Sequence, residues 1–408
     1  MSTTGQRMGE PGIYFDHNAT TPLHPTVWEA MRPLLTDVFG NPSSLHTEGL
    51  QARDAVEEAR ARVAQLVGAR SEEIVFTSGG TEADNLAILG SVLAQRRQGG
   101  HVVTSQIEHP AVLGSCRALE TQGFRVTRLP PGSAGLIDPD DLAKVLTDDT
   151  LLVTLMHANN EVGTVQLIQA CAELAHTRGI LVHTDAVQSV GKIPTLVDDL
   201  GVDLLTLSGH KLHGPKGVGA LYVRRGTALD SMVTGGPQEY GLRGGTEHVA
   251  AIVGLGVAAQ LASTHMSVEM PQVAALRDRL EQGIQAAIPD VLLNGATAPR
   301  LPTTTNISFK GVDGQSLVVA LDLKGVAAST GSACSSGSLE PSHVLIAMGL
   351  ADEWLHGAVR FSLGSGNTLA EVDAVLRMLP PTVARLRQYT RGSVRQATMT
   401  PSPIRRPP

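Results

Sequence analysis

Residues 77–82 (TSGGTE) are the first of three polar segments in this 408-residue chain whose residue types could do chemistry. The segment places two glycines and Thr81 where a short apolar run gives way to a helical pattern. Glycines let the backbone approach an anion closely, and the N–H groups at a helix start can bind it. A phosphate site is one interpretation, and an ordinary strand-to-helix turn capped by Thr81 is the other.

Two charged residues follow later apolar runs. Asp185 comes directly after residues 180–184 (ILVHT), and Lys211 follows residues 204–207 (LLTL). A carboxylate there could hold a cationic ring nitrogen, although capping is the commoner role of a single Asp. A desolvated lysine can bond covalently to a carbonyl carbon, although a surface lysine fits the sequence as well. Together, a phosphate loop, a carboxylate and a lysine are what pyridoxal phosphate (PLP) requires.

The segments that would position these residues alternate short apolar runs with amphipathic runs, which predicts strands alternating with helices. The expected strands cover residues 73–77, 101–105, 124–129, 151–156, 180–184, 204–207 and 218–223. Continuous apolar strands predict an α/β protein with a mostly parallel sheet covered by helices. Ligands of such sheets bind beyond the carboxyl ends of the strands, where the three polar segments begin.

A second αβ pattern after Pro289 predicts a smaller α/β domain, which a long helical pattern from about residue 247 connects to the first. We therefore expect four parts: an N-terminal arm (1–22) that packs with the small domain, a large PLP-binding domain (23–262), a small domain (263–390) and a disordered, Pro-rich tail (391–408).

Composition limits the class of function. Apolar residues make up 42% of the chain, which excludes a wholly disordered protein. The net charge of −7 argues against direct binding of nucleic acid through its phosphates. Three cysteines without a CxxC pair exclude a disulfide framework and predict no metal site. No apolar run reaches about 18 residues and no secretory signal is present, so we expect a cytoplasmic protein without a membrane partner.

The chain resembles the cysteine desulfurases of the NifS/IscS type, in the class V aminotransferase superfamily with PLP fold type I. The matching segments run in family order and cover residues 14–21 (YFDHNATT), 39–49, 77–87, 108–113, 156–166, 183–192 (HTDAVQSVGK), 208–217 (SGHKLHGPKG), 241–248, 329–345 (STGSACSSGSLEPSHVL) and 359–364. The resemblance implies PLP as cofactor and L-cysteine as substrate. It also implies the products L-alanine and a persulfide on the protein.

The resemblance further implies a role for individual residues. Lys211 would carry the cofactor's aldehyde, and Cys334 would accept the substrate's sulfur. His109 would stack on the cofactor ring and could move protons. The remaining contacts would be made by Asp185 at the ring nitrogen, Gly80, Thr81, Ser208 and His210 at the phosphate, Gln188 and Asn160 at the phenolic oxygen, Thr246 at the phosphate of the neighbouring subunit, and Asn160 and Arg360 at the substrate.

The same resemblance implies a homodimer with shared sites, and a sulfur acceptor that is an iron–sulfur scaffold or a tRNA-thiolation protein. The tail does not resemble the end of the IscS proteins that docks their scaffold, so the acceptor stays open. A selenocysteine lyase, another class V aminotransferase and a non-catalytic sulfur relay are the alternatives. His213 has no assigned role, and His343 could either line the site or begin a helix. Cys116 and Cys171 are expected to be buried in helices.

Overall fold

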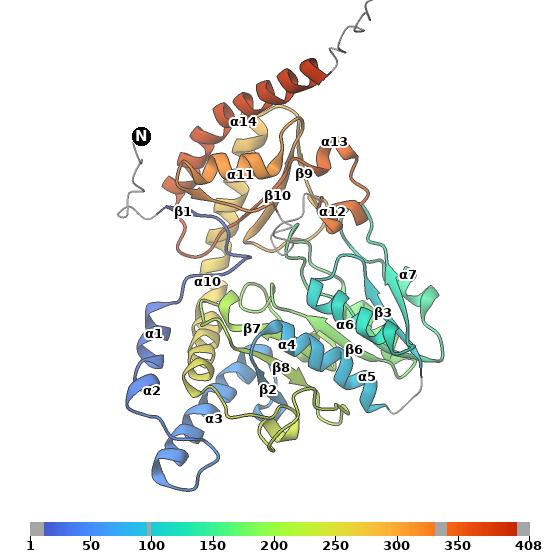
Figure 1. Ribbon diagram of the computed structural model, residues 1–408, viewed down its shortest axis with the longest axis vertical. Coiled ribbons are helices and arrows are strands. Elements are labelled where there is room, and N and C mark those ends of the chain that lie inside the picture. The colour runs from blue at the N-terminus through green and yellow to red at the C-terminus, as the bar shows by residue number, and fades with distance from the viewer. Residues whose placement is uncertain (1–11, 96–98, 331–340, 398–408) are drawn as a thin grey trace, which may run out of the picture.

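The computed structural model describes residues 12–95, 99–330 and 341–397, arranged in a large lobe and a small lobe (Figure 1). A seven-stranded sheet forms the large lobe, in the order β2 (Ile74–Thr77), β8 (Gly219–Val223), β7 (Leu204–Ser208), β6 (Leu181–Asp185), β5 (Thr150–Thr154), β3 (His101–Ser105) and β4 (Arg125–Leu129). Only the pairings of β8 are antiparallel. The predicted α/β fold with a mostly parallel sheet is therefore confirmed.

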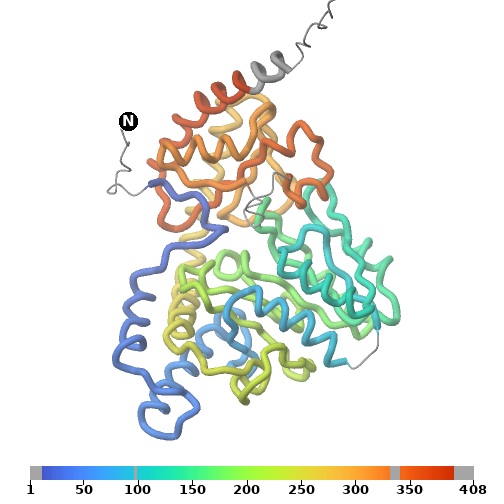
Figure 2. The backbone as a smooth tube through the Cα atoms, in the orientation of Figure 1, coloured from blue at the N-terminus to red at the C-terminus, as the bar shows by residue number. Residues whose placement is uncertain are grey.

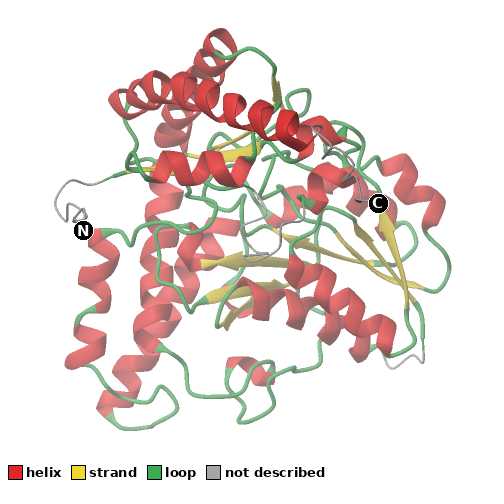
Figure 3. Cartoon of the chain, turned by 45° about the horizontal axis from the view of Figure 1, so that its top comes forward, coloured by secondary structure: helices red, strands yellow, loops and turns green. Residues whose placement is uncertain are grey.

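Helices cover both faces of this sheet (Figure 3). Neighbouring strand residues show why: Val103 belongs to a core that also includes residues of α7 and α8, whereas Val102 belongs to a separate core that includes residues of α6. Alternate strand residues point to opposite faces, so a continuous apolar strand needs cover on both. The helical segments of the large lobe are α1 (Pro25–Met31), α2 (Pro33–Thr36), α3 (Thr47–Val67), η1 (Ser71–Glu73), α4 (Gly80–Asn85), η2 (Leu86–Gly90), α5 (Ser91–Ala94), α6 (Pro110–Thr121), α7 (Pro139–Val145), α8 (Ile168–His176), α9 (Val197–Leu200), η3 (Gly209–Lys211) and η4 (Glu239–Gly241).

The small lobe is built on a three-stranded antiparallel sheet. Its order is β12 (Ala358–Ser362), β10 (Thr304–Phe309) and β9 (Val291–Leu293). The remaining elements of this lobe are β11 (Val326–Ala327), α11 (Gly314–Asp322), α12 (His343–Ala347), α13 (Asp352–Leu355) and α14 (Leu369–Ala397). The N-terminal segment lies against this lobe (Figure 2), because β1 (Ile13–Tyr14) pairs with β11 and Phe15 is buried in the small-lobe core.

Helix α10 (Val249–Ala287) passes from one lobe into the other. Residues up to Ala262 pack in the large-lobe core, and residues from Met270 pack in the small-lobe core. The predicted domain boundary at 262/263 therefore falls inside one continuous helix. By length and composition α10 could cross a membrane, but 56% of its most apolar window is buried inside the protein, as in the core helix of a globular fold.

Helix α14 extends into the segment that the sequence analysis assigned to a disordered tail. Residues 391–397 (RGSVRQA) continue the helix to Ala397. Arg, Gln and Ala have high helix propensity, which favours these additional turns over an irregular chain. Residues 398–408, the Pro-rich part of the predicted tail, lie outside the described residues.

Candidate active site

A cavity of about 360 Å³ lies at the carboxyl edge of the large sheet. It brings together ten of the residues for which the sequence predicted a role: Gly80, Thr81, His109, Asn160, Asp185, Gln188, Ser208, His210, Lys211 and Arg360. Most follow the ends of β2, β3, β5, β6 and β7, which point to the same edge. The sheet thus collects side chains that are far apart in the sequence, as parallel sheets do at their ligand sites.

Asp185 forms the acidic end of this cavity. Its side chain is buried, and its Oδ1 accepts a hydrogen bond from the backbone N–H of Val187 at 2.9 Å. Burial raises the pKa of the Asp185 carboxyl, and the neighbouring His109 and Lys211 oppose that rise. A buried carboxylate can hold a protonated ring nitrogen, since a positive partner favours the charged form of the carboxyl.

His109 caps helix α6, and Pro110 at the first helical position fixes the chain direction there. The His109 Nδ1 accepts a hydrogen bond from the N–H of Ala111 at 3.2 Å. This contact fixes the tautomer, because an acceptor Nδ1 in a neutral imidazole leaves the proton on Nε2. Burial is the main cause that lowers the pKa of His109, so the ring favours its neutral form.

Two further buried carboxyls, those of Asp84 and Glu108, lie near Asp185, and the sequence analysis did not assign them a role. Asp84 lines the cavity from α4, and burial together with Asp185 raises its pKa well above the usual range. Glu108 accepts from Ser105 Oγ at 2.6 Å, and burial raises its pKa to about 8. The side chains of Asp84, His109 and Asp185 come close enough to hold a metal ion, the only such group among the described residues. The same three side chains are also suited to surround a cationic ring nitrogen.

Lys211 follows β7 on the short segment η3 and lines the cavity. Its Nζ donates to the carbonyl oxygens of Asn18 and, at 2.8 Å, Ala19. Two residues of the N-terminal segment therefore aim the amine. Their motif (YFDHNATT) carried the family resemblance, but no role at the site was predicted for either residue.

The opposite end of the cavity fits a phosphate group. Gly80 begins α4, and a Cβ at this position would lie only 2.9 Å from a methyl carbon of Val187. Glycine therefore lets the start of α4 lie against Val187, and Thr81 and Ser208 line the cavity beside it. His210 contributes a neutral ring here, since burial lowers its pKa to about 4.

Arg360 enters the cavity from strand β12 of the small lobe. Its side chain is buried, with Nη1 donating to the carbonyl of Asn160 at 2.9 Å and Nη2 to Asp16 at 2.8 Å. Its Nε is buried without a hydrogen-bond partner. The planar fork is held in place by protein acceptors and presents further donors that suit a carboxylate.

Two predicted site residues remain, Cys334 and Thr246. Cys334 lies outside the described residues, but both flanks of its segment are anchored at the site. Ser329 exchanges backbone hydrogen bonds with Arg360, and the His343 Nε2 lies 3.0 Å from the carbonyl oxygen of Glu108. Thr246 is exposed just before α10 and does not line its own chain's cavity.

The remaining expectations concern cysteines and histidines away from the cavity. Cys116 and Cys171 are buried in α6 and α8, and burial raises the pKa of their thiols to about 12 and about 11. His343 begins α12, so it has the helix-start position in addition to its contact with Glu108. His213 has a positive φ of 60°, and its Nδ1 lies 3.1 Å from the carbonyl of Pro22.

Comparisons with known proteins identify the family of this chain. The family described as aminotransferase class-V matches residues 13–375. The cysteine desulfurase IscS of Dictyoglomus turgidum is 50% identical over 375 residues, which covers 92% of this chain and 95% of the relative. A cysteine desulfurase of Nostoc sp. is 53% identical over 92% of this chain and 94% of its own length. The chain belongs to the class V aminotransferase family.

Solved structures show the same likeness. A NifS-like protein superposes with a TM-score of 0.86 at 36% identity, covering 92% of this chain and 100% of that chain. A structure of SspA in complex with cysteine has a TM-score of 0.78 at 40% identity, covering 87% of this chain and 100% of that chain.

Proposed function

We propose that this protein is a PLP-dependent cysteine desulfurase, which converts L-cysteine to L-alanine and retains the sulfur as a persulfide. The observation that carries the proposal is one cavity that joins Lys211, Asp185 and Arg360 in a chain about half identical to curated cysteine desulfurases. Class V aminotransferases use PLP, and the donor set of the cavity suits that cofactor.

The residues of the cavity match the chemical groups of PLP one by one. Thr81 and Ser208 line the cavity beside Gly80 at the start of α4, where the phosphate would be held. Asp185 would pair with the ring nitrogen, and His109 would lie against the ring. Lys211 would hold the aldehyde carbon. When bound, PLP supplies an electron sink for the bonds at the substrate's α-carbon.

The chain's own residues then handle the substrate. Arg360 binds the L-cysteine carboxylate through its fork. The Lys211 amine accepts the α-proton of the substrate and can return it. Neutral His109 carries its proton on Nε2 and can donate it there. Lys211 and His109 can therefore serve as the proton-transfer groups at the substrate.

We assign sulfur transfer to Cys334. Its thiolate attacks the sulfur of L-cysteine, an S–S bond forms, and the C–S bond breaks with its electron pair left on the substrate carbon. A proton then converts that carbon to the methyl group of L-alanine. The net change is one thiol plus L-cysteine giving one persulfide plus L-alanine, which needs no outside oxidant. The anchored flanks at Ser329 and His343 support delivery of this residue to the site.

The test is release of L-alanine from L-cysteine by the PLP-loaded protein with a reducing thiol present. Lys211→Ala is expected to abolish release, and Lys216→Ala, a matched exposed lysine in the same loop, is expected to retain it. Absence of alanine from a wild-type protein that holds PLP would contradict the proposal. Faster release from L-selenocysteine than from L-cysteine would favour a selenocysteine lyase.

The exposed position of Thr246 supports a homodimer in which this residue reaches the neighbouring site. A dimer that combines one Lys211→Ala subunit with one Thr246→Ala subunit would then keep one intact site. We expect such mixed dimers to recover activity that neither homodimer has; no recovery would place Thr246 in its own site or in no site.

The persulfide would pass by thiol exchange to an acceptor protein in the cytoplasm, either an iron–sulfur scaffold or a tRNA-thiolation protein.

A further inference from the structure

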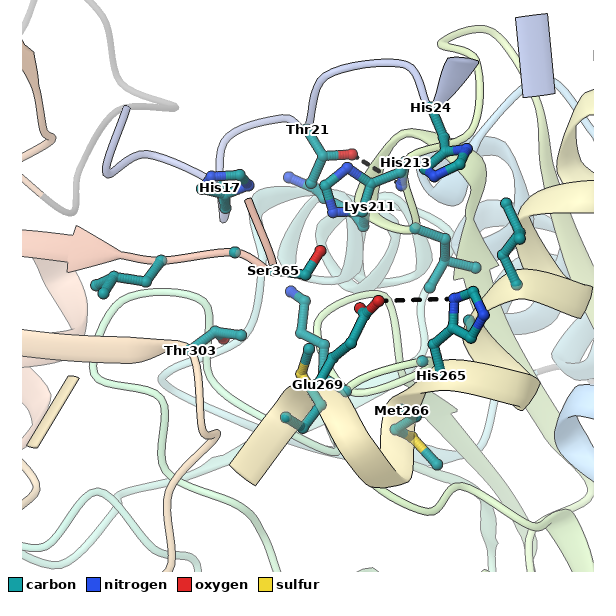
Figure 4. A pocket seen from close by; sticks show the side chains of 18 residues that line it. His17, Thr21, His24, Lys211, His213, His265, Met266, Glu269, Thr303 and Ser365 are labelled. Atoms are coloured by element: carbon teal, nitrogen blue, oxygen red, sulfur yellow. Dashed lines mark hydrogen bonds and ion pairs between the residues drawn. The ribbon is translucent and has the colours of Figure 1, made fainter. Parts of the chain in front are cut away.

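A second, smaller cavity of about 100 Å³ also borders Lys211 (Figure 4). The N-terminal segment contributes His17 and His24, helix α10 contributes His265 and Glu269, and the small lobe contributes Ser365. One cation in its lining, Lys192, belongs to the motif HTDAVQSVGK but has no part in the chemistry described so far.

Lys192 is a buried lysine with an unusual environment. Its side chain is 7% exposed, and its Nζ donates to Oε1 of Gln188 at 3.0 Å. Among the described residues no carboxylate forms an ion pair with it. The charged or titratable groups that face it are Lys211, Arg360, His17, His210 and His213. Burial, with Lys211 and Arg360 adding to it, lowers the pKa of Lys192 to about 7. Such a residue costs stability, so a compensating role is expected.

The partner of Lys192 is held from two sides. Gln188 accepts from Lys192 through Oε1, and its Nε2 donates to the carbonyl oxygen of Asn18 at 3.0 Å. The Asn18 carbonyl can only accept, so a reversed amide would place its oxygen against another acceptor. The protonated form of Lys192 can only donate, so it would in addition face the NH₂ of the reversed amide. The amide therefore has one orientation. Its second N–H remains for a ligand in the main cavity, which Gln188 lines.

We propose that Lys192 is a positioning residue that locks the side-chain amide of Gln188 so that an N–H faces the phenolic oxygen of bound PLP. This inference rests on the proposed function. A donor fixed beside that oxygen stabilises its anionic form. Loss of the lock frees the amide to turn its own oxygen toward the cofactor, which disfavours the anion.

The test is a pH titration of the visible absorbance of the bound cofactor, which does not depend on turnover. We expect Lys192→Met to raise the apparent pKa of the chromophore by about one pH unit. Lys192→Arg, which keeps a charged group that only donates, is expected to titrate as the wild type does. Lys324→Met removes an exposed lysine of the small lobe and serves as the matched control, with no change expected.

A double-mutant cycle separates positioning from a direct effect of charge. In a Gln188→Ala background, Lys192→Met is expected to move the titration by less than about 0.3 units, because the residue through which Lys192 acts is gone. The same upward shift in both backgrounds would overturn the positioning role, and so would no shift in either. If Lys192→Met does not fold, Lys192→Gln replaces it, since an amide can turn an acceptor toward Gln188 and should cause the same upward shift.

Failure of this inference is distinct from failure of the proposed function. A wild-type protein that gains no visible absorbance band with PLP would contradict the proposed function itself. A wild type with the band and a Lys192→Met variant that titrates identically would contradict only the role of Lys192.

Discussion

Replacing Arg360 by lysine should weaken L-cysteine binding much more than it slows turnover. Arg360 is 2% exposed, and its guanidinium is held by Asn160 at 2.9 Å and Asp16 at 2.8 Å, so its remaining donors are presented rigidly. A lysine keeps the charge but has a single nitrogen, which cannot contact both protein acceptors and also grip a carboxylate with two parallel hydrogen bonds. One lost charge-assisted hydrogen bond is worth about 1.5–3 kcal/mol, or roughly a 10- to 150-fold rise in KM.

The assay is steady-state alanine formation over a range of L-cysteine concentrations, with kcat and KM determined separately. Arg279→Lys is the matched control, because Arg279 is half-exposed and pairs with Asp373 on the surface of the small lobe. We expect a large rise in KM for Arg360→Lys alone, with kcat within about fivefold of wild type. An unchanged KM, or a loss confined to kcat, would refute the role of Arg360 as the carboxylate clamp.

Two further predictions concern stability and pH. Glu239 accepts from Arg60 at 2.7 and 2.9 Å and from the Phe76 N–H at 2.7 Å, and Arg60 is 4% exposed, so Glu239→Gln leaves a buried cation poorly compensated. We expect the free energy of unfolding in urea to fall by about 3 kcal/mol, and a fall below about 1 kcal/mol would contradict this reasoning. Because burial lowers the pKa of His109, its neutral form persists as the pH falls below 6.5. The acid limb of kcat attributable to His109 should therefore lie below pH 6.5. A limb above pH 7 that disappears in His109→Gln would mean that the pKa of His109 is raised, which would contradict this prediction.

The strands of the large lobe could be predicted from sequence because each is a short, continuous apolar run. β5, β6 and β7 have almost no exposed residue, and burial on both faces leaves that signature. The predicted strand ends then pointed to Asp185 and Lys211, because these polar residues come at or just after the ends of two apolar runs. Residues 391–397 carry no apolar period, so the continuation of α14 was not visible in the pattern.

Other parts of the site could not be predicted because they depend on contacts between distant segments. Asn18 supplies a backbone carbonyl to Lys211, and a backbone group leaves no trace in residue type. Asp84 lies on a helix among ordinary polar residues, and only the fold shows that it is buried beside Asp185. The partnership of Lys192 with Gln188 is a local i,i+4 contact, but only the burial of both residues shows that it is more than a surface pair.

The most direct test of the account is the mass of the peptide that contains Cys334 after the PLP-loaded protein reacts with L-cysteine without a reducing thiol. We predict one added sulfur atom on that peptide and an equal amount of L-alanine, with Cys116→Ala and Cys171→Ala variants behaving as the wild type. Cys334→Ala should form no persulfide and release no alanine. Alanine formed at the wild-type rate by Cys334→Ala, or added sulfur found only at Cys116 or Cys171, would contradict the central claim.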